Sequence, residues 1–259
     1  MKKLILLTSI LLMAASCSNS LPQNRVIAHR GFWQTEGSAQ NSMASLRLAV
    51  ESGFYGSECD IQLTADSCFI VFHDTSIHGR NVEDMTFEEV LADTTLVNGE
   101  RISTVDEYFS AFAGMKGATK LIIEVKPQVT DDMMSLSIAR TAEAIQKYGI
   151  QDRVEIISFN YRACKELAAI FPEIPVSFLD RTHNVSFAQM KADGIDGIDY
   201  RYNCILEDLS LIEEAHEAGF IVDVWTPDDP DEVLTMVEAG LDYVTTNRPD
   251  LMLEILQGI

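Results

Sequence analysis

Residues 56–74 read GSECDIQLTADSCFIVFHD, and this stretch decides the fold of the chain. Two short apolar segments within it, 57–61 and 68–72, are typical of buried β-strands. Only a few residues around Asp66 connect them, and a connection this short permits only an antiparallel hairpin. We therefore expect one strand to run outward and a second strand to return beside it.

Similar apolar segments recur along the rest of the chain, and amphipathic helical patterns follow most of them. With the outward strand of the hairpin included, the strand candidates are 26–29, 57–61, 121–126, 154–158, 176–179, 197–200, 221–225 and 243–246. The helical patterns cover 42–51, 131–148, 161–170, 186–192, 207–218 and 231–238. Eight strands that alternate with helices indicate an α/β fold, and they favour a parallel TIM (β/α)8 barrel over a doubly wound sheet.

The return strand, 68–72, is additional to the eight barrel strands. After it, residues 74–103 are acidic and rich in turn-forming residues, with one short helical pattern at 86–92. Long loops in compact domains are usually functional, so we interpret this segment as a short insertion that covers the mouth of the barrel. Residues 25–259 form one expected domain, because their apolar content is ample for a single large core.

The first 16 residues have the pattern of an export signal. Their apolar run is shorter than the roughly 20 residues that a membrane-spanning helix needs, and small residues end the signal directly before Cys17. This arrangement resembles a bacterial lipoprotein signal, in which Cys17 becomes the lipidated N-terminus and residues 17–24 are a polar tether. The alternative is ordinary secretion after cleavage near Ser16. We expect an exported protein of the cell envelope that faces the periplasm and contacts a membrane only through this lipid anchor.

The formal net charge of −21 restricts the partners of the chain. Such an acidic chain is a poor match for nucleic acid, whose phosphates require basic residues on the protein. An anionic substrate needs a locally positive site, so the site must supply its own cation. The cysteines after Cys17 show neither a CxxC pattern nor a zinc-binding Cys/His spacing, and they predict no disulfide framework.

Carboxylates recur on the inward faces of two neighbouring strands. Glu58 and Asp60 stand two positions apart, so their side chains leave the same face of one strand. Glu124 and Lys126 repeat this pattern in the next barrel strand, within an otherwise apolar segment where an isolated buried charge would be costly. Either strand alone is consistent with structural ion pairs, whereas both together indicate a metal site. An oxygen-only set of ligands suits one Ca2+ or Mg2+ ion rather than Zn2+.

Two histidines end strands at the catalytic end of the predicted barrel. His29 follows the first strand, and the hairpin carries His73 back beside Glu58 and Asp60. A single histidine at a strand end is more often structural or incidental. Two of them beside a carboxylate site predict a general acid and a general base, because imidazole serves both functions near neutral pH and phosphodiester cleavage needs both.

Several motifs resemble, in their order and spacing, those of the glycerophosphodiester phosphodiesterase family across residues 25–259. They are HRG at 29–31, QNS at 40–42, ECD at 58–60, HD at 73–74, EVK at 124–126, VWT at 224–226 and VTTNRP at 244–249. The resemblance implies a TIM barrel that hydrolyses a small-molecule glycerophosphodiester to sn-glycerol 3-phosphate and an alcohol. The nucleophile of this reaction is either the neighbouring glycerol hydroxyl, through a cyclic phosphate, or water.

The same resemblance implies roles for individual residues. The implied ligands of Ca2+ or Mg2+ are Glu58, Asp60 and Glu124. The implied general acid and base are His29 and His73. The implied phosphate contacts are Arg30 and Lys126, with Asn41 as a polar support of the site.

The chain departs from the family pattern at two places. Gln40 replaces the glutamate of the usual Pro-Glu-Asn-Thr motif, which lowers the negative charge near the metal site. Residues 226–229 read TPDD where a Thr-Val-Asn type of sequence is common, and residues 247–248 replace the usual acidic residue near the last strand. Substrate selection can therefore differ from the usual case. Trp225 is equally consistent with an apolar wall for the alcohol moiety and with a core position.

Two other functions stay open at this point. A phospholipase C-like or D-like phosphodiesterase would keep the barrel and the metal but act on a phospholipid head group. The loops after Ile61, Phe72 and Lys126 are mostly polar or acidic, which disfavours insertion into a bilayer. A catalytically silent lipoprotein would use the barrel only for binding. Gln40 is the one residue that supports this function, and the retention of a paired acid and base argues against it.

Overall fold

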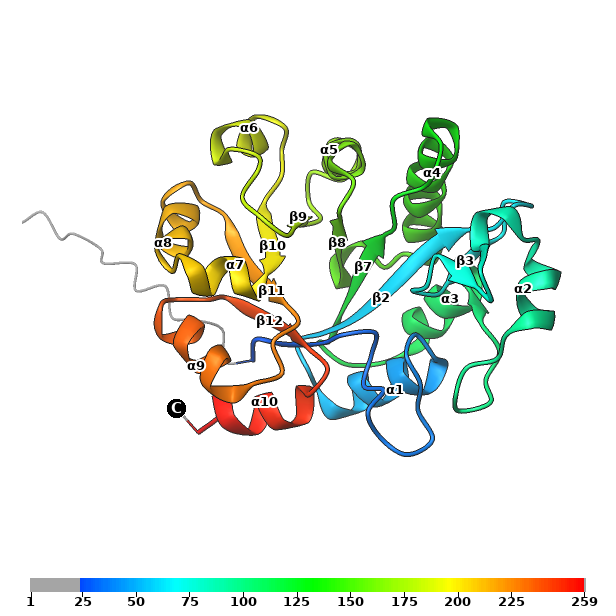
Figure 1. Ribbon diagram of the computed structural model, residues 1–259, viewed down its shortest axis with the longest axis horizontal. Helices are drawn as coiled ribbons and strands as arrows, with labels where there is room; N and C mark the ends of the chain where they lie inside the picture. The colour runs from blue at the N-terminus through cyan, green and yellow to red at the C-terminus, as the bar shows by residue number, and fades with distance from the viewer. Residues whose placement is uncertain (1–23, 259) are drawn as a thin grey trace, which may run out of the picture.

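The computed structural model describes residues 24–258 and shows a parallel β/α barrel (Figure 1). Its strands are β1 (Val26–Ala28), β2 (Gly56–Leu63), β7 (Lys120–Val125), β8 (Val154–Ser158), β9 (Val176–Asp180), β10 (Gly197–Arg201), β11 (Ile221–Trp225) and β12 (Tyr243–Thr246). Each pairs in parallel with the next, and β1 pairs with both β12 and β2, which closes the barrel. The predicted TIM barrel is confirmed. The predicted export signal and the lipidation site at Cys17 lie outside the described residues.

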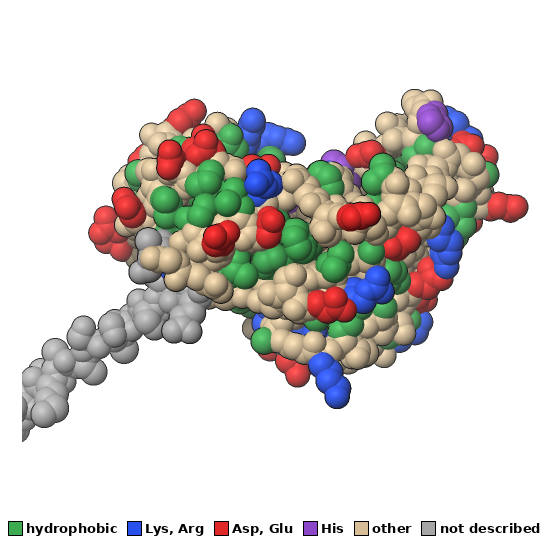
Figure 2. Space-filling view, turned by 90° about the horizontal axis from the view of Figure 1, so that it is seen from below, with side chains coloured by type: hydrophobic (Ala, Val, Ile, Leu, Met, Phe, Trp, Pro, Cys, Tyr) green, Lys and Arg blue, Asp and Glu red, His purple; other side chains and the backbone are tan. Residues whose placement is uncertain are grey.

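The helices form an outer layer around these strands (Figure 1), and acidic side chains are spread over the face of the molecule that Figure 2 shows. They are α1 (Met43–Ser52), α3 (Val105–Gly114), α4 (Asp131–Tyr148), α5 (Tyr161–Ile170), α6 (Phe187–Ala192), α7 (Tyr202–Glu207), α8 (Ser210–Glu217), α9 (Pro230–Glu238) and α10 (Pro249–Leu256). Their apolar faces and the outward side chains of the strands form the main hydrophobic core. A smaller apolar cluster fills the interior of the barrel, and its buried members are Ile27, Ile122, Ile157 and Leu179.

Three of these helices, α3, α7 and α10, were not predicted from the sequence. The start of α3 carries a clear signal, because the Thr104 hydroxyl accepts a hydrogen bond from the backbone of Glu107 and the Glu107 carboxylate accepts one from the backbone of Thr104. The start of α10 carries another, because Pro249 occupies its first turn. Within the described residues, the longest helices are too polar, and the apolar ones too short, to cross a membrane.

A hairpin and an insertion follow the second barrel strand. β3 (Phe69–Val71) pairs antiparallel with β2 and with β6 (Ser103–Thr104). Between β3 and β6 lie β4 (Ser76–Ile77), β5 (Arg80–Asn81), the 3-10 helix η1 (Val82–Asp84) and α2 (Phe87–Asp93). This insertion packs around its own apolar cluster, whose buried residues are Ile70, Ile77, Val82, Met85, Val90 and Ile102. Because it has this separate core, the insertion stands at one side of the barrel (Figure 1) and forms part of the wall of the mouth.

Close packing of β9, β10 and β11 gives the first testable prediction. A Cβ atom added at Gly197 would lie 2.4 Å from Ser177 Oγ and 3.0 Å from the backbone oxygen of Ile221. Gly197→Ala should therefore lower the free energy of unfolding by about 1–3 kcal/mol, as overpacked cores do. Urea unfolding followed by circular dichroism measures this change. The control is Gly114→Ala in α3, where an added Cβ meets nothing within 4 Å. Equal stability of both variants would contradict the packing argument.

Candidate active site

Three buried carboxylates converge at the carboxyl ends of β2 and β7. Asp60 is the direct neighbour of Glu124 in the strand register, and Glu58 lies two residues before Asp60 on the same face. One carboxylate oxygen from each of the three residues lies within 4.8 Å of the others. Glu58 and Asp60 are each 1% exposed and Glu124 is 8% exposed. The structure thus brings together the three residues predicted to be metal ligands, in a place that water hardly reaches.

Two cations and one backbone amide balance part of this negative charge. Lys126 Nζ lies 3.3 Å from Asp60 Oδ1 and 3.1 Å from Glu124 Oε1. Arg30 Nε lies 3.7 Å from Asp60 Oδ2, and the backbone N–H of Arg30 donates to Glu58 Oε2 at 2.7 Å. Burial alone would raise the pKa of Asp60, but the attraction of Lys126, followed by that of His73 and Arg30, holds this pKa at about 2.

The other two carboxyl groups hold their protons more tightly. Burial, together with the charges of Asp60 and Glu124, raises the pKa of Glu58 well above its usual value. Burial and the charge of Asp60 raise the pKa of Glu124 to about 7. Glu58 Oε1 is buried, and no described residue hydrogen-bonds to it. Three close carboxylates, one of them with an unpartnered oxygen, fit a divalent cation of the hard, oxygen-binding class.

His29 is held by two residues that follow the last two barrel strands, Asp228 after β11 and Asn247 after β12. Its Nδ1 lies 2.8 Å from Asn247 Oδ1, and both the backbone and the side-chain N–H groups of Asn247 donate to the carboxylate of Asp228. Because the Asn247 amide nitrogen faces Asp228, its oxygen faces His29, and His29 Nδ1 therefore carries the proton. Burial, followed by the charge of Arg30, lowers the pKa of His29 to about 4. His29 is consequently neutral near pH 7, with Nε2 free to accept a proton.

His73 reaches the same site from the hairpin. The backbone N–H of Phe72 donates to the Asp60 carbonyl, and the Gln62 side chain donates to the carbonyls of Phe72 and Asp74, so β2 fixes the turn that carries His73. His73 Nδ1 lies 2.8 Å from Asp74 Oδ1, and the His73 side chain is 34% exposed. Burial lowers the pKa of His73, although the charge of Asp60 opposes this shift. With Nδ1 engaged by a carboxylate, Nε2 is the nitrogen available to a substrate.

The loop after β1 holds two residues in the left-handed region of the backbone. Arg30 has a φ of 56° and Asn41 a φ of 58°, a conformation that costs non-glycine residues of order 1–3 kcal/mol. Asn41 fixes Asp60 through two hydrogen bonds, from its amide group to Asp60 Oδ2 at 2.8 Å and from the Asp60 backbone to its amide oxygen at 3.1 Å. Gln40 Oε1 accepts from Arg30 at 2.6 Å. The residue that departs from the family pattern therefore orients the Arg30 guanidinium.

Gly31 explains why the His-Arg-Gly motif ends in glycine. Its φ is 76°, and a Cβ atom at this position would lie 2.5 Å from Ser45 Oγ in α1. The Ser45 hydroxyl donates to the Arg30 carbonyl at 3.1 Å. The loop therefore packs directly on α1, and this contact maintains the unusual backbone of Arg30.

A cavity of about 370 Å³ opens above the carboxylates. Both histidines, Arg30 and Lys126 line it, as do Phe159, Trp225 and Arg181. Trp225 packs edge-on against Phe159 with the ring centroids 5.4 Å apart, so it belongs to the cavity wall as well as to the barrel interior. The Arg181 guanidinium lies 5.1 Å from the centre of the Phe159 ring.

Sequence reasoning did not find several residues of this site, among them Asp228, Asn247 as a partner of His29, Arg181, Phe159 and the buried Asp199. A basic residue directly after the β9 strand was the available signal for Arg181, because residues at the carboxyl ends of barrel strands face the mouth. No signal in the sequence joins Asn247 to His29, since the two residues are 218 positions apart.

A TIM barrel with buried carboxylates and two histidines at its carboxyl end has the fold and the residues that a metal-assisted hydrolase would use. A family model described as the glycerophosphoryl diester phosphodiesterase family matches residues 29–251. The match spans most of the chain, and the chain belongs to this family, whose members are phosphoric diester hydrolases.

Individual relatives agree with this membership. A glycerophosphodiester phosphodiesterase of Caldanaerobacter subterraneus subsp. tengcongensis is 26% identical over 245 residues, which span 90% of this chain and 97% of that protein. The crystal structure of a glycerophosphodiester phosphodiesterase from Parabacteroides distasonis is 35% identical, with a TM-score of 0.86, and the match covers 92% of this chain and 99% of that one. A phosphodiesterase of Oleispira antarctica, solved in complex with the product sn-glycerol-3-phosphate, shares the fold at 24% identity and a TM-score of 0.78, over 91% of this chain and 97% of that one.

The raised pKa values of the carboxyl groups give a prediction for metal binding. Because the pKa of Glu124 is about 7, the metal-free folded chain keeps a proton that the unfolded chain loses near pH 4.5, and its stability falls as the pH rises between these values. A divalent cation competes with this proton, so it should stabilise the protein more at pH 8 than at pH 5.5. At about 100 times the dissociation constant, Ca2+ or Mg2+ should add about 2.7 kcal/mol at pH 8, or roughly 5–10 °C in melting temperature.

Differential scanning fluorimetry with EDTA and metal add-back measures this effect. Glu124→Gln should lose the stabilisation by metal, whereas Glu213→Gln, on the exposed surface of α8, should keep it. An equal rise in melting temperature at both pH values would show that protons and metal do not compete at these carboxylates.

Proposed function

We propose that this chain hydrolyses a glycerophosphodiester to sn-glycerol 3-phosphate and an alcohol by general acid and base catalysis with two histidines. The observation that carries the proposal is the presence of His29 and His73 in one cavity with the buried carboxylates, each with Nδ1 held by a partner. Family membership supports the reaction class, and the relative from Oleispira antarctica, whose structure holds sn-glycerol-3-phosphate as product, supports the glycerol moiety.

The three carboxylates would hold one Ca2+ or Mg2+ ion, because both ions prefer carboxylate oxygens. Such an ion would polarise the non-bridging oxygens of the phosphate. Arg30 and Lys126 lie at the same carboxylates and line the cavity, so they are placed to contact those oxygens as well. Asn41 keeps the Asp60 carboxylate in place during this binding.

The two histidines divide the proton transfers in this scheme. His29 is half-buried and neutral near pH 7, and its Nε2 is free, so it accepts the proton of the nucleophile, which is either the neighbouring glycerol hydroxyl or water. His73 has a carboxylate partner at Nδ1, which favours its protonated form and opposes the lowering of its pKa by burial, so it donates a proton to the leaving alkoxide. Trp225 and Phe159 form the apolar wall that shields the reacting groups from water.

A soluble diester is a better match than a phospholipid in a bilayer. The large hydrophobic residues found exposed in the described part of the chain are Val97, Val129 and Ile170. They are three single residues, in the insertion, in the loop after β7 and at the end of α5, and three single residues do not make a continuous apolar surface for a bilayer.

The assignment of base and acid predicts different responses to the leaving group. His29→Ala and His73→Ala should each lower kcat by about 10²- to 10⁴-fold on a diester with an ordinary alcohol. On a nitrophenyl ester, whose leaving group needs no proton, His73→Ala should recover much of its activity, whereas His29→Ala should not. The assay measures release of glycerol 3-phosphate or nitrophenolate.

His78→Ala, on the exposed surface of the insertion, is the control for this experiment and should behave as the wild type. Near-normal turnover of ordinary diesters by the His29→Ala, His73→Ala double variant would refute the catalytic proposal. It would favour a barrel that only binds its ligand.

The N-terminal pattern leads to a proposal about location. We propose that Cys17 carries a lipid that anchors the protein to the cell envelope, with the barrel facing the periplasm. In cells fed a labelled fatty acid, the wild-type chain should take up the label, and Cys17→Ala should lose it and appear in the soluble fraction. Cys204→Ala, which changes a half-buried barrel cysteine, should keep the label. A label retained by Cys17→Ala would exclude this anchor.

A further inference from the structure

A second cavity, of about 330 Å³, lies beside the carboxylate cavity. It is formed between the loop after β1 and the insertion, and its volume is within the range of roughly 300–1,000 Å³ that is common for small-molecule sites. His73 is the residue that lines both cavities. None of the residues described as metal ligands lines the second cavity, so it is a separate compartment that meets the active site at His73.

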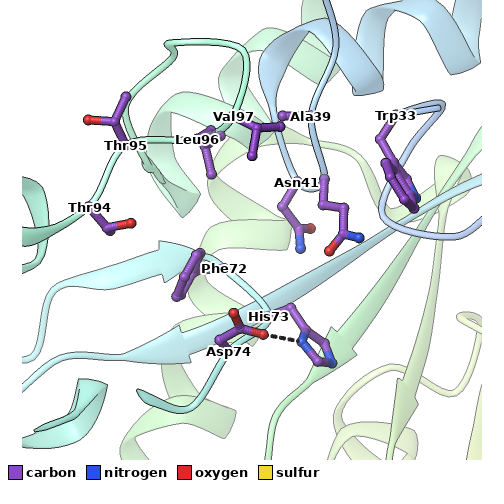
Figure 3. Close-up of a pocket in the computed structure, with 11 residues that line it drawn as sticks. Trp33, Ala39, Asn41, Phe72, His73, Asp74, Thr94, Thr95, Leu96 and Val97 are labelled. Atoms are coloured by element: carbon purple, nitrogen blue, oxygen red, sulfur yellow. Dashed lines mark hydrogen bonds and ion pairs between the residues drawn. The ribbon is translucent and has the colours of Figure 1, made fainter. Parts of the chain in front are cut away.

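The lining of the second cavity is aromatic and acidic. In Figure 3, Trp33 and Phe72 lie on opposite sides of the pocket, and His73 and Asp74 form its edge between them. The Asp74 carboxylate is 67% exposed and is the one charged carboxylate among the described residues that line it. Those lining residues include neither lysine nor arginine. Apart from His73, these residues offer an anion no cationic partner, whereas a cation would meet aromatic faces and a carboxylate.

The rim of the second cavity is anchored. Leu96 and Val97 form this rim, and the loop that carries them is closed by a hydrogen bond from the Leu96 backbone to the Glu100 carbonyl at 2.9 Å. The Glu100 carboxylate accepts from the backbone of Met43 at 2.9 Å and of Ala44 at 3.3 Å, at the start of α1. The insertion is therefore tied to the first barrel helix, and the two walls of the cavity keep a fixed separation.

The position of His73 indicates which part of a substrate enters this cavity, on the basis of the function proposed above. The phosphate must lie with Arg30 and Lys126 in the carboxylate cavity. A general acid must be within hydrogen-bond reach of the leaving oxygen. If His73 donates that proton, the alcohol on the far side of the leaving oxygen extends past His73, into the second cavity.

We propose that the second cavity is the subsite for the leaving alcohol, and that it selects alcohols that carry a quaternary ammonium group. Trp33 and Phe72 supply aromatic faces for the cation, and Asp74 supplies a negative charge close to it. His73 Nδ1 bonds to one oxygen of Asp74, Oδ1, which leaves the other oxygen free to face a cation. Trp33, Phe72 and Asp74 are thus determinants of specificity for the alcohol.

The test compares two esters of glycerol 3-phosphate that have the same shape. One carries choline and the other carries 3,3-dimethylbutanol, the uncharged carbon analogue of choline. For each protein we take the ratio of kcat/KM for the choline ester to kcat/KM for the uncharged ester. The intrinsic reactivities of the two esters are the same for every protein, so a difference in this ratio between wild type and variant reports a change in charge preference. Val97→Lys places a like charge at the rim and should lower this ratio by about 3- to 10-fold. Trp33→Leu removes an aromatic face and should lower the ratio by about 2- to 30-fold.

The matched control is Val129→Lys. Val97 is 94% exposed and lines the second cavity, whereas Val129 is 79% exposed and lines neither cavity. Val129→Lys should therefore leave the ratio within about 2-fold of that of the wild type, since a solvated charge that enters neither cavity is screened by salt. A ratio that is the same in all four proteins, with both esters hydrolysed, overturns the subsite and leaves the proposed function intact. Failure of all four proteins to release glycerol 3-phosphate from either ester overturns the proposed function.

A measurement on the wild type alone tests the cation preference even if the variants fold poorly. Tetramethylammonium chloride should inhibit hydrolysis of the choline ester competitively, beyond the effect of sodium chloride at equal ionic strength. Identical rates in the two salts, up to several hundred millimolar, overturn the cation preference.

Discussion

Three carboxylates buried within 4.8 Å of one another impose the constraint on which the rest of the site depends. Their mutual repulsion in a poorly hydrated place would be costly without partners. Lys126 lies between Asp60 and Glu124, and the Arg30 backbone turns into the left-handed region so that its N–H reaches Glu58. Packing of that loop on α1 maintains the turn. The remaining negative charge allows the same cluster to bind a divalent cation. The repulsion between the carboxylates therefore both destabilises the metal-free fold and favours metal binding.

Much of the fold could be read from the sequence because it depends on local patterns. Short apolar segments mark the barrel strands, and the tight connection near Asp66 allowed only one geometry for the hairpin. The helix α3 was missed because its capping signal at 104–107 falls directly after the turn-rich insertion and looked like a part of it. The sequence predicted that the insertion lies at the barrel mouth but not that it has a core of its own, because that core depends on contacts between distant residues such as Ile70 and Ile102.

The residues of the site also divide into those that local sequence patterns predict and those that depend on contacts between distant residues. Spacing of two residues along a strand places Glu58 and Asp60 on one face, so the carboxylate cluster could be predicted from the sequence. The support of His29 by Asn247 could not, since it arises only when β1 and β12 become neighbours. Trp225 was equally consistent with a wall and a core position, and the structure gives it both: it packs on Phe159 and lines the cavity. A side chain in a barrel strand can serve both purposes at the rim, where the core ends.

The pairing of β1 with β12 has a further consequence for when the enzyme becomes competent. His29 directly follows the first strand to leave the ribosome, and Asn247, which fixes its tautomer, directly follows the last. A nascent chain can already contain both histidines and the three clustered carboxylates, yet His29 Nδ1 has no Asn247 to bind until the final strand docks. This order of assembly would tie the proposed activity to completion of the chain.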